Sequence, residues 1–369
     1  MTAAAVNAQE ILESINEGLY VTDTTRRIVY WGKAAERITG WSSSEVIGKR
    51  CHEGVLCHID KDGHQLCGEE HCPLHRSMVT GQSSTVPITV FARTKAGGRV
   101  PMQVRVAPLV DREDNIIGGV ETFRDLTQEF ADISRARKIQ LLALGQDLPT
   151  DPRARFSVHY IPHDMIGGDY FAAETLAPNQ HAFMLADVAG HGVPAALYTM
   201  FLHSLWESHK HLLLNPPEFA RAVGNQLHHL IKEMGPFVVS LCGIFDLDRG
   251  VLRMIGNGNP GPLVIRSTGE WEEPVVEGFP FGLMLDAEYE ETVVPLRRGD
   301  CVLLFTDGAT EVPLAKGGML GTAGLRRVLE SAGYPGSAPN FNKIEAQLLA
   351  ASDRIRFDDD LTFVDVRIA

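Results

Sequence analysis

The segment Ala182-Phe-Met-Leu-Ala-Asp187-Val-Ala-Gly-His-Gly192 runs from an apolar, strand-like stretch into an aspartate and then into a turn with two glycines. Glycine allows such a turn to bring the backbone close to a ligand. Aspartates at strand ends or in tight turns recur in three further segments: Gly167-Gly-Asp169, Thr306-Asp307-Gly308 and Asp358-Asp-Asp-Leu-Thr362. One Asp-Gly pair is an ordinary turn. Four such segments together indicate strands of one core that bring their carboxylates to one rim.

Carboxylates gathered at one rim cannot all stay ionised by themselves, because each negative charge raises the pKa of its neighbours. Hard divalent cations remove this conflict, and ligand sets made of oxygen alone favour Mg²⁺ or Mn²⁺ over Zn²⁺. Two such ions about 3.5–4 Å apart can bind a phosphate and activate a bridging water for in-line displacement. The aspartate segments therefore predict a binuclear metal centre that hydrolyses phosphate esters.

The rest of the C-terminal half alternates strand-like runs with paired helical stretches. The strand-like runs are 156–161, 181–186, 237–247, 251–255, 262–265, 301–306 and 361–367. The helical stretches are 194–214, 217–233, 324–331 and 342–351. Many strands with helices inserted in pairs predict stacked sheets covered by helices, which is an α+β layered architecture.

The order Gly-Gly-Asp, Asp-Val-x-Gly-His-Gly, Gly-Asn-x-x-Pro-Gly-Pro, Thr-Asp-Gly and Asp-Asp-x-Thr resembles the PPM-type metal-dependent protein serine/threonine phosphatases, in their bacterial SpoIIE/RsbU branch. The resemblance covers about residues 135–369. It implies an αββα layered sandwich over 149–369 and hydrolysis of phosphoserine or phosphothreonine by a metal-activated water. It also implies a phosphorylated STAS-domain anti-anti-sigma protein as the substrate, in a partner-switching pathway.

The same resemblance assigns residues. The metal ligands that it implies are Asp169, Asp187, the carbonyl of Val188, Asp307 and Asp359, with Asp187 and Asp169 also in catalytic roles. Asp360 ranks below Asp359 as a ligand, since many relatives carry Asn at that place. His191 and Asn257 are placed in loops beside the substrate.

Two positions depart from the family pattern. Many relatives carry an acidic residue where this chain has Ala172, and often His where it has Asn259. Neither is a core metal ligand, so an active enzyme remains the prediction. The alternative is a weak or inactive phosphatase fold that serves as a sensor scaffold and only binds a regulatory partner.

Gly167-Gly-Asp-Tyr-Phe171 also resembles the diguanylate cyclase signature superficially, but the Glu of that signature is missing.

The N-terminal part predicts a sensor domain. Two extended runs within 18–31, a helix at 33–39 and three strand-like runs at 85–94, 100–110 and 116–123 give a compact α+β unit. The segments Trp31-Gly-Lys-Ala-Ala-Glu-Arg-Ile-Thr-Gly-Trp41 and Asn115-Ile-Ile-Gly-Gly-Val-Glu-Thr-Phe-Arg-Asp125 resemble the PAS family. The resemblance implies a PAS domain over 7–125, with an antiparallel five-stranded sheet and helices.

A helical pattern over 126–148 follows the sensor domain. Its apolar residues Leu126, Phe130 and Ile133 fall on one face, with Ile139 and Leu142 after them. Such a helix either forms the coiled-coil seam of a homodimer and transmits the signal, or packs as a linker on its own domain. Both readings stay open.

A segment rich in cysteine and histidine, 51–75, lies inside the sensor domain. Thiolates and imidazoles together suit zinc, or iron in a single site or a cluster. The segment resembles an insertion of some signalling PAS domains, and this resemblance implies Cys51, His58, Cys67 and Cys72 as ligands, with Cys57 as a bystander or a replacement ligand. Zinc would be a structural clip and iron a redox or gas sensor. Free thiols are the alternative.

Composition excludes several classes of protein. At 44% hydrophobic and 22% charged residues the chain is typical of soluble globular proteins, and a net charge of -13 argues against a nucleic-acid binder. The sequence has neither a signal-peptide pattern nor an apolar run near the ~20 residues of a membrane helix. A cytoplasmic protein without membrane partners is expected.

Overall fold

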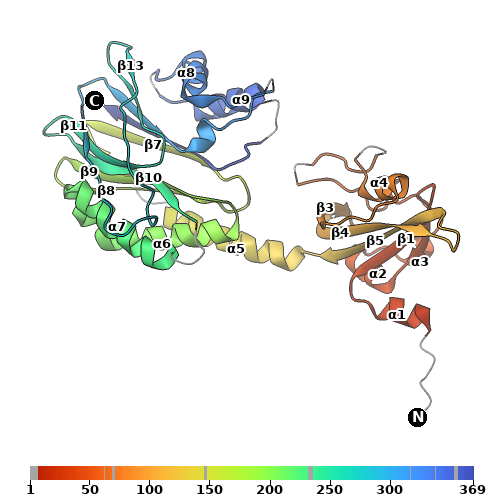
Figure 1. The fold of residues 1–369 in the computed structure, drawn as a ribbon. Coiled ribbons are helices and arrows are strands. Elements are labelled where there is room, and N and C mark those ends of the chain that lie inside the picture. The colour runs from red at the N-terminus through yellow and green to blue at the C-terminus, as the bar shows by residue number, and fades with distance from the viewer. Residues whose placement is uncertain are drawn as a thin grey trace. The chain divides into compact units, whose positions relative to one another are not determined.

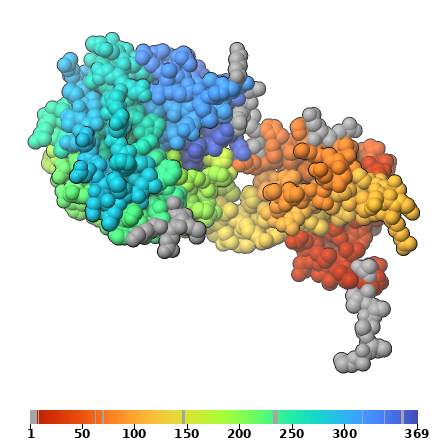
Figure 2. Space-filling view, in the orientation of Figure 1, coloured from red at the N-terminus to blue at the C-terminus, as the bar shows by residue number. Residues whose placement is uncertain are grey.

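The computed structural model describes residues 7–61, 63–68, 71–144, 148–231, 236–315, 317–336, 338–352 and 356–369. The chain divides into two compact units, Met1–Asp132 and Ile133–Ala369. Figure 1 traces their elements, and Figure 2 shows each unit as a closely packed body. Among the described residues, no helix is long and apolar enough to cross a membrane.

Unit 1 is built on an antiparallel five-stranded sheet in the order β2-β1-β5-β4-β3. Its strands are β1 (Gly18–Asp23), β2 (Ile28–Trp31), β3 (Ile88–Arg93), β4 (Arg99–Val110) and β5 (Ile116–Asp125). Its helices are α1 (Ala8–Ser14), α2 (Lys33–Thr39), α3 (Ser43–Val46) and α4 (Pro73–Thr80). The expected PAS architecture is confirmed.

One face of this sheet forms the core of unit 1. In β4, Val100, Met102, Val104 and Val106 alternate with more exposed residues, so that every second side chain is buried. They belong to one apolar cluster that also includes Leu74 of α4. Gly40 ends α2 in the left-handed conformation, with φ of 76°.

Unit 2 contains two sheets. The first has the order β14-β11-β10-β9-β8 and the second β13-β12-β15-β16-β7-β6. The strands are β6 (Thr150–Asp151), β7 (Ala154–Ile161), β8 (Asp169–Ala177), β9 (Gln180–Val188), β10 (Val238–Asp246), β11 (Val251–Asn257), β12 (Leu263–Ile265), β13 (Trp271–Glu272), β14 (Thr292–Pro295), β15 (Cys301–Phe305) and β16 (Leu361–Ile368). The helices are α6 (Val193–His209), α7 (Pro216–Ile231), α8 (Gly321–Ala332) and α9 (Phe341–Ser352).

Three apolar clusters hold these layers together. Between the sheets, Phe183 and Phe245 of the first pack with Phe156 of the second. A second cluster joins the outer face of the first sheet to α6 and α7, and a third joins the outer face of the second sheet to α8 and α9. Figure 1 shows the two helix pairs on opposite sides of the sheets. The expected αββα sandwich is confirmed.

Several elements of unit 2 differ from the sequence-based expectation, among them the strands β6, β8, β13 and β14, which no predicted run covers. The strand β8 was not expected, because Ala172, Ala173 and Glu174 have low strand propensity; pairing with β9 and burial on both faces decide its conformation. The helix expected over 194–214 ends at His209 and continues as a 3₁₀ segment, Lys210–Leu214.

Helix α5 (Thr127–Leu144) follows β5 with only Leu126 between them. The side chain of Asp125 accepts a hydrogen bond from the backbone N–H of Thr127 at 2.7 Å, which satisfies one of the free donors at the start of the helix. The expected helix over 126–148 extends beyond Leu144 into residues 145–147, which lie outside the described part of the chain. The domain limits 7–125, 126–148 and 149–369 remain predictions.

Candidate active site

The aspartates of the four sequence segments come from both sheets of unit 2. Asp169 is the first residue of β8 and pairs directly with Asp187 on β9. Asp307 follows the end of β15, while Asp359 and Asp360 immediately precede β16. Since β15 and β16 are antiparallel neighbours, the end of one and the start of the other lie at the same edge of the second sheet.

Asp169 is held by two threonines. The hydroxyls of Thr306 and Thr362 donate to its Oδ2 at 2.9 and 2.5 Å, and the residue is only 2% exposed. Its Oδ1 is buried and has no hydrogen-bond partner among the described residues. Burial raises the pKa of Asp169 well above its usual range, and the charges of Asp187 and Asp360 raise it further. A buried carboxylate oxygen without a donor is a suitable ligand for a cation.

Asp187 and Asp307 also have raised pKa values. Burial raises the pKa of Asp187 to about 8, and the negative charges of Asp307, Asp359 and Asp360 contribute to the shift. The pKa of Asp307 is raised to about 6 by burial and then by the charge of Asp359. A bound cation would reverse these shifts, because it stabilises the ionised form of each carboxylate.

Asp360 has a different surrounding from the other aspartates. Its Oδ1 accepts a hydrogen bond from the backbone N–H of His163 at 2.6 Å, and its Oδ2 accepts from the backbone N–H groups of Gly168 and, at 3.4 Å, Asp169. Asp360 therefore fixes the segment that leads into β8. The neighbouring Asp359 accepts the backbone N–H of Asp360 at 2.8 Å and is less buried. Asp359 as a metal ligand remains a prediction, as does the lower rank of Asp360.

The two glycines before Asp169 are required by lack of space. A Cβ on Gly167 would lie 2.1 Å from the hydroxyl of Tyr160 and 2.6 Å from both carboxylate oxygens of Asp360. A Cβ on Gly168 would lie 2.9 Å from the carbonyl oxygen of Val188. The absence of side chains thus lets this segment lie against both Asp360 and the end of β9.

The other predicted residues of the phosphatase site, Val188, His191 and Asn257, differ in their exposure to solvent. Val188 is buried at the end of β9, and its N–H donates to the carbonyl of Gly168 at 3.2 Å. His191 lies in the turn before α6 with its side chain 62% exposed. Asn257 is fully buried, and its amide donates to Ser240 at 2.8 Å. Asn257 therefore holds β11 to β10 in this structure and does not face solvent.

Some residues of this region were not expected from the sequence. Thr306 and Thr362 belong to the quoted motifs, and their positions beside motif aspartates were an available signal. Gln140, whose amide donates to the carbonyl of Gly167 at 2.7 Å, lies outside these motifs, as do His163 and Asp164. Among the described residues, His163, Asp164 and His191 form a group whose possible ligand atoms all lie within 4.8 Å of one another. In the described part of the chain, neither the phosphatase aspartates nor the cysteine cluster forms a group of three with ligand atoms this close together.

The predicted ligands of unit 1 lie partly in its core. Cys51, Cys72 and His58 are buried, and the backbone N–H of His58 donates to Sγ of Cys67 at 3.0 Å. Cys57 instead directs its Sγ to the carbonyl of His52 at 3.4 Å. Glu121 of β5 was not expected here, and its Oε1 lies 3.7 Å from Nε2 of His58.

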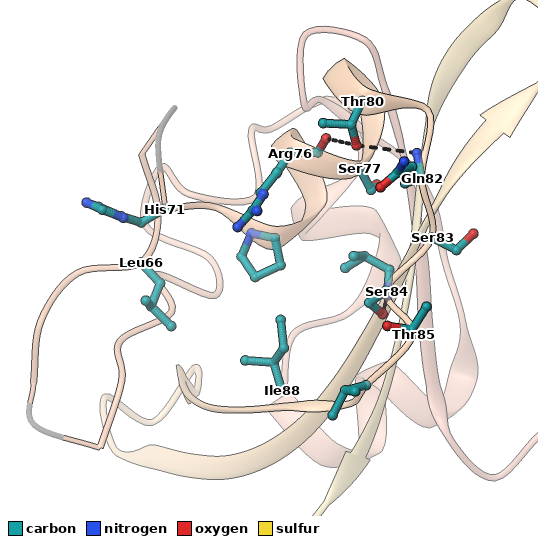
Figure 3. A pocket seen from close by; sticks show the side chains of 13 residues that line it. Leu66, His71, Arg76, Ser77, Thr80, Gln82, Ser83, Ser84, Thr85 and Ile88 are labelled. Atoms are coloured by element: carbon teal, nitrogen blue, oxygen red, sulfur yellow. Dashed lines mark hydrogen bonds between the residues drawn. The ribbon is translucent and has the colours of Figure 1, made fainter. Parts of the chain in front are cut away.

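A separate pocket of about 420 Å³ opens in unit 1 between α4 and residues 82–88. Figure 3 shows Arg76, Ser77 and Thr80 of α4 on one side and Ile88 on another. The Thr80 hydroxyl donates to the carbonyl of Arg76 at 2.8 Å and accepts from the N–H of Gln82 at 3.3 Å. None of the predicted metal ligands lines this pocket, so it is not the metal site.

Family comparisons agree with both units. The sequence profile of Stage II sporulation protein E (SpoIIE) matches residues 177–369, and the profile of a PAS fold matches 12–130. The phosphoserine phosphatase RsbU of Bacillus subtilis (strain 168) is 22% identical over 308 residues, which cover 82% of this chain and 88% of RsbU. The phosphoserine phosphatase RsbP of the same organism is 24% identical over 183 residues, 49% of this chain and 45% of RsbP.

Solved structures share the fold of unit 2. The SiaA-PP2C domain of Pseudomonas aeruginosa has a TM-score of 0.55 at 20% identity, covering 66% of this chain and 98% of that domain. The RsbU and RsbW domains of Rv1364c from Mycobacterium tuberculosis have a TM-score of 0.52 at 22% identity, covering 60% of this chain and 63% of that one. Unit 2 therefore has the fold of a PP2C-type phosphatase.

Proposed function

The chain belongs to the SpoIIE family and is a PAS-fused protein phosphatase. We propose that it hydrolyses phosphoserine or phosphothreonine on a regulatory protein in the cytoplasm. The observation that carries the proposal is the pairing of Asp169 with Asp187, two buried carboxylates with raised pKa values on adjacent strands. The names of the relatives RsbU and RsbP, both phosphoserine phosphatases, support the same chemistry.

The donor set fits two Mn²⁺ or Mg²⁺ ions, because every proposed ligand atom is an oxygen. The proposed ligands are Asp169, Asp187, the carbonyl of Val188, Asp307 and Asp359. When bound, the ions would supply an activated water and stabilise the charge on the phosphate. Thr306 and Thr362 occupy Oδ2 of Asp169 and leave its Oδ1 for a ligand, while Asp360 holds the preceding backbone.

We also propose a phosphorylated STAS-domain protein as the substrate and a homodimer as the working form. The substrate rests on the likeness to the RsbU and RsbP group. For the homodimer, the supporting feature is on α5, where Ile139 is 60% and Leu142 81% exposed in the single chain. A second copy would bury these side chains. Light scattering of wild type and Leu142→Glu tests the homodimer. The wild type should be dimeric and the variant monomeric if the dimer forms through this face of α5.

The experiment for the phosphatase is release of phosphate from a phosphoserine protein with Mn²⁺, with and without a chelator. Wild type should be active only with the metal, and Asp187→Asn should lose the activity. Asp114→Asn is the matched control, since Asp114 is exposed and its positive φ of 62° suits Asn. A wild type that is folded, loaded with Mn²⁺ and inactive, even without its PAS unit, would instead favour the scaffold alternative.

A second function, metal-based sensing in unit 1, is favoured by one specific observation. His58 Nε2 and Glu121 Oε1 are both buried, 3.7 Å apart and without hydrogen-bond partners among the described residues. Burial lowers the pKa of His58 to about 4 and raises that of Glu121 to about 8, so burial favours the neutral form of both groups. Nearby, burial raises the pKa of Cys67 to about 12. A bound zinc or iron ion would satisfy these groups.

Metal analysis of the purified full chain tests the sensing proposal. Zinc or iron should be present in wild type and in Cys57→Ser, because the Sγ of Cys57 is directed to the carbonyl of His52. It should be lost from Cys72→Ser and Glu121→Gln. A colourless protein with zinc would make the site a structural clip, whereas a coloured one with iron would make it a sensor. Equal metal content in all variants would contradict the site.

A further inference from the structure

Two histidines and an aspartate meet beside the aspartates of the candidate active site. Nδ1 of His191 lies 3.5 Å from Oδ2 of Asp164, and Nε2 of His163 lies 4.0 Å from the same oxygen. The centroids of the two imidazole rings are 5.1 Å apart. We propose that His163, Asp164 and His191 bind one divalent transition-metal ion, at a site distinct from the carboxylate centre.

The distances fit a shared ion better than direct bonding. Two donor atoms that each lie about 2.1 Å from a tetrahedral ion are about 3.4 Å apart. The His191–Asp164 distance is close to this value, and the His163–Asp164 distance needs only a small closure. Both distances exceed a good hydrogen bond between nitrogen and oxygen. The three groups therefore converge without satisfying one another directly.

The orientation of His163 is fixed in a way typical of metal ligands. Its Nδ1 lies 3.1 Å from the carbonyl oxygen of Phe357, which can only accept. Nδ1 therefore carries the proton, and Nε2 presents its lone pair on the side of Asp164. A histidine that ligates through one nitrogen and donates to a carbonyl through the other has its tautomer and ring orientation set in advance. The His163 side chain is 12% exposed, so little motion is left to it.

The backbone secures this arrangement from both sides. The N–H of His163 donates to Oδ1 of Asp360 at 2.6 Å, which fixes the first ligand to the start of β16. His191 lies between Gly190 and Gly192, whose φ values of 97° and 78° allow the turn to present its side chain outward. An ion here would join this turn to the segment before β8.

Ligand chemistry identifies the ion. Two imidazoles and one carboxylate suit Zn²⁺ and other late first-row divalent ions, whereas Mg²⁺ prefers oxygen ligands alone. The site is open to solvent, because His191 is 62% and Asp164 35% exposed. Three protein ligands would thus leave positions for water or for a phosphate oxygen. The protein would then have two neighbouring metal sites of different selectivity: the carboxylate centre, with oxygen ligands alone, and this site, with nitrogen and oxygen ligands.

Equilibrium dialysis of the full chain against Zn²⁺, with Mg²⁺ in large excess, tests the site. His163→Ala and His191→Ala should each bind one Zn²⁺ fewer per chain than wild type, and circular dichroism should show that both remain folded. His229→Ala is the matched control, an exposed histidine outside the group, and should bind as wild type does. Any zinc bound at the cysteine cluster of unit 1 is the same in all these proteins, so it does not affect the difference in bound zinc between them. Equal zinc content in all four would overturn the proposal.

Co²⁺ absorption separates this site from the other two. Binding at this site should add weak visible bands that differ from the strong thiolate bands of a cysteine site, and these weak bands should disappear in His163→Ala. They should persist in Asp307→Asn, which removes a proposed ligand of the carboxylate centre only. Loss of the bands in Asp307→Asn but not in His163→Ala would place the ion at the carboxylates and refute the site, whether or not the protein is a phosphatase.

Discussion

The side chain of Gln140 donates a hydrogen bond to the carbonyl oxygen of Gly167 at 2.7 Å. Gln140 belongs to α5 and is 3% exposed, and Gly167 is two residues before Asp169. The same amide also bonds the hydroxyl of Thr199 in α6 at 2.9 Å. The helix that follows the PAS unit thus directly holds the backbone that places a candidate metal ligand.

Replacement of Gln140 should therefore affect activity as well as stability. Gln140→Ala leaves a buried carbonyl and hydroxyl without their donor, and we expect a loss of about 1–3 kcal/mol in the free energy of unfolding. We also expect weaker Mn²⁺ binding, since Asp169 would be less well positioned. Urea denaturation and a Mn²⁺ titration of turnover measure the two effects. Gln128→Ala, at an exposed site of the same helix, should change neither; similar effects from both variants would sink the idea.

Stability of the metal-free protein should fall as pH rises. The pKa of Asp187 in the folded state is about 8, above the unfolded value, so the folded protein holds the proton more tightly. Stability is then greatest below about pH 4 for this group and is lost as pH increases towards 8, by at most about 1.4 kcal/mol per pH unit. Urea midpoints in chelator should show this slope. Asp187→Asn should flatten it, and saturating Mn²⁺ should remove it. A slope unchanged by the variant would contradict the assignment.

Substitutions of Asp360 and Asp359 should separate positioning from metal binding. Both carboxylate oxygens of Asp360 accept backbone N–H groups, and Asn can accept through only one of them. Asp360→Asn should therefore lower stability by about 1–3 kcal/mol and retain bound Mn²⁺. Asp359→Asn should retain stability and lose Mn²⁺ affinity. Calorimetric titration with Mn²⁺ distinguishes the two, and equal loss of affinity would make Asp360 a ligand after all.

Gly167 should not tolerate even a methyl group. Gly167→Ala brings a Cβ against Tyr160 and Asp360, and we expect a loss of about 1–3 kcal/mol from overpacking. Gly98→Ala is the control, because its nearest neighbour would be at 3.7 Å. Thermal unfolding measures both. A Gly167→Ala protein as stable as the control would show that the segment can move away from Asp360.

Much of the fold could be predicted from local patterns. Apolar runs ending in aspartate identified β9 and β15, and a strand-like run between turns identified β4, because these strands carry their pattern in consecutive residues. The strand β8 could not be identified in this way: Ala172 and Ala173 become strand residues only through pairing with β9. The 3₁₀ segment after His209 likewise reflects packing between helices and sheet rather than a local breaker.

Motifs in the sequence identified the aspartates, Val188 and His191, but not the residues that contact them from distant parts of the chain. The aspartates lie in recognisable turns, whereas Gln140, His163 and Glu121 act through partners that are distant along the chain. The hydrogen bond from the N–H of His163 to Asp360, for example, joins the segment before β8 to the one before β16. No spacing rule connects such residues, because their meeting depends on how the two sheets stack.

The short junction between β5 and α5 restricts how sensor modules can be exchanged. A helix turns by about 100° per residue, and Gln140 must reach Gly167 after a helix that starts at Thr127. Inserting one residue between them would change the helical phase between Thr127 and Gln140 by about 100°, whereas seven residues, nearly two full turns, would restore that phase. When another PAS domain is fused to this phosphatase, in evolution or in the laboratory, the fusion should therefore work best when the length of the connecting helix differs by about seven residues or a multiple of seven.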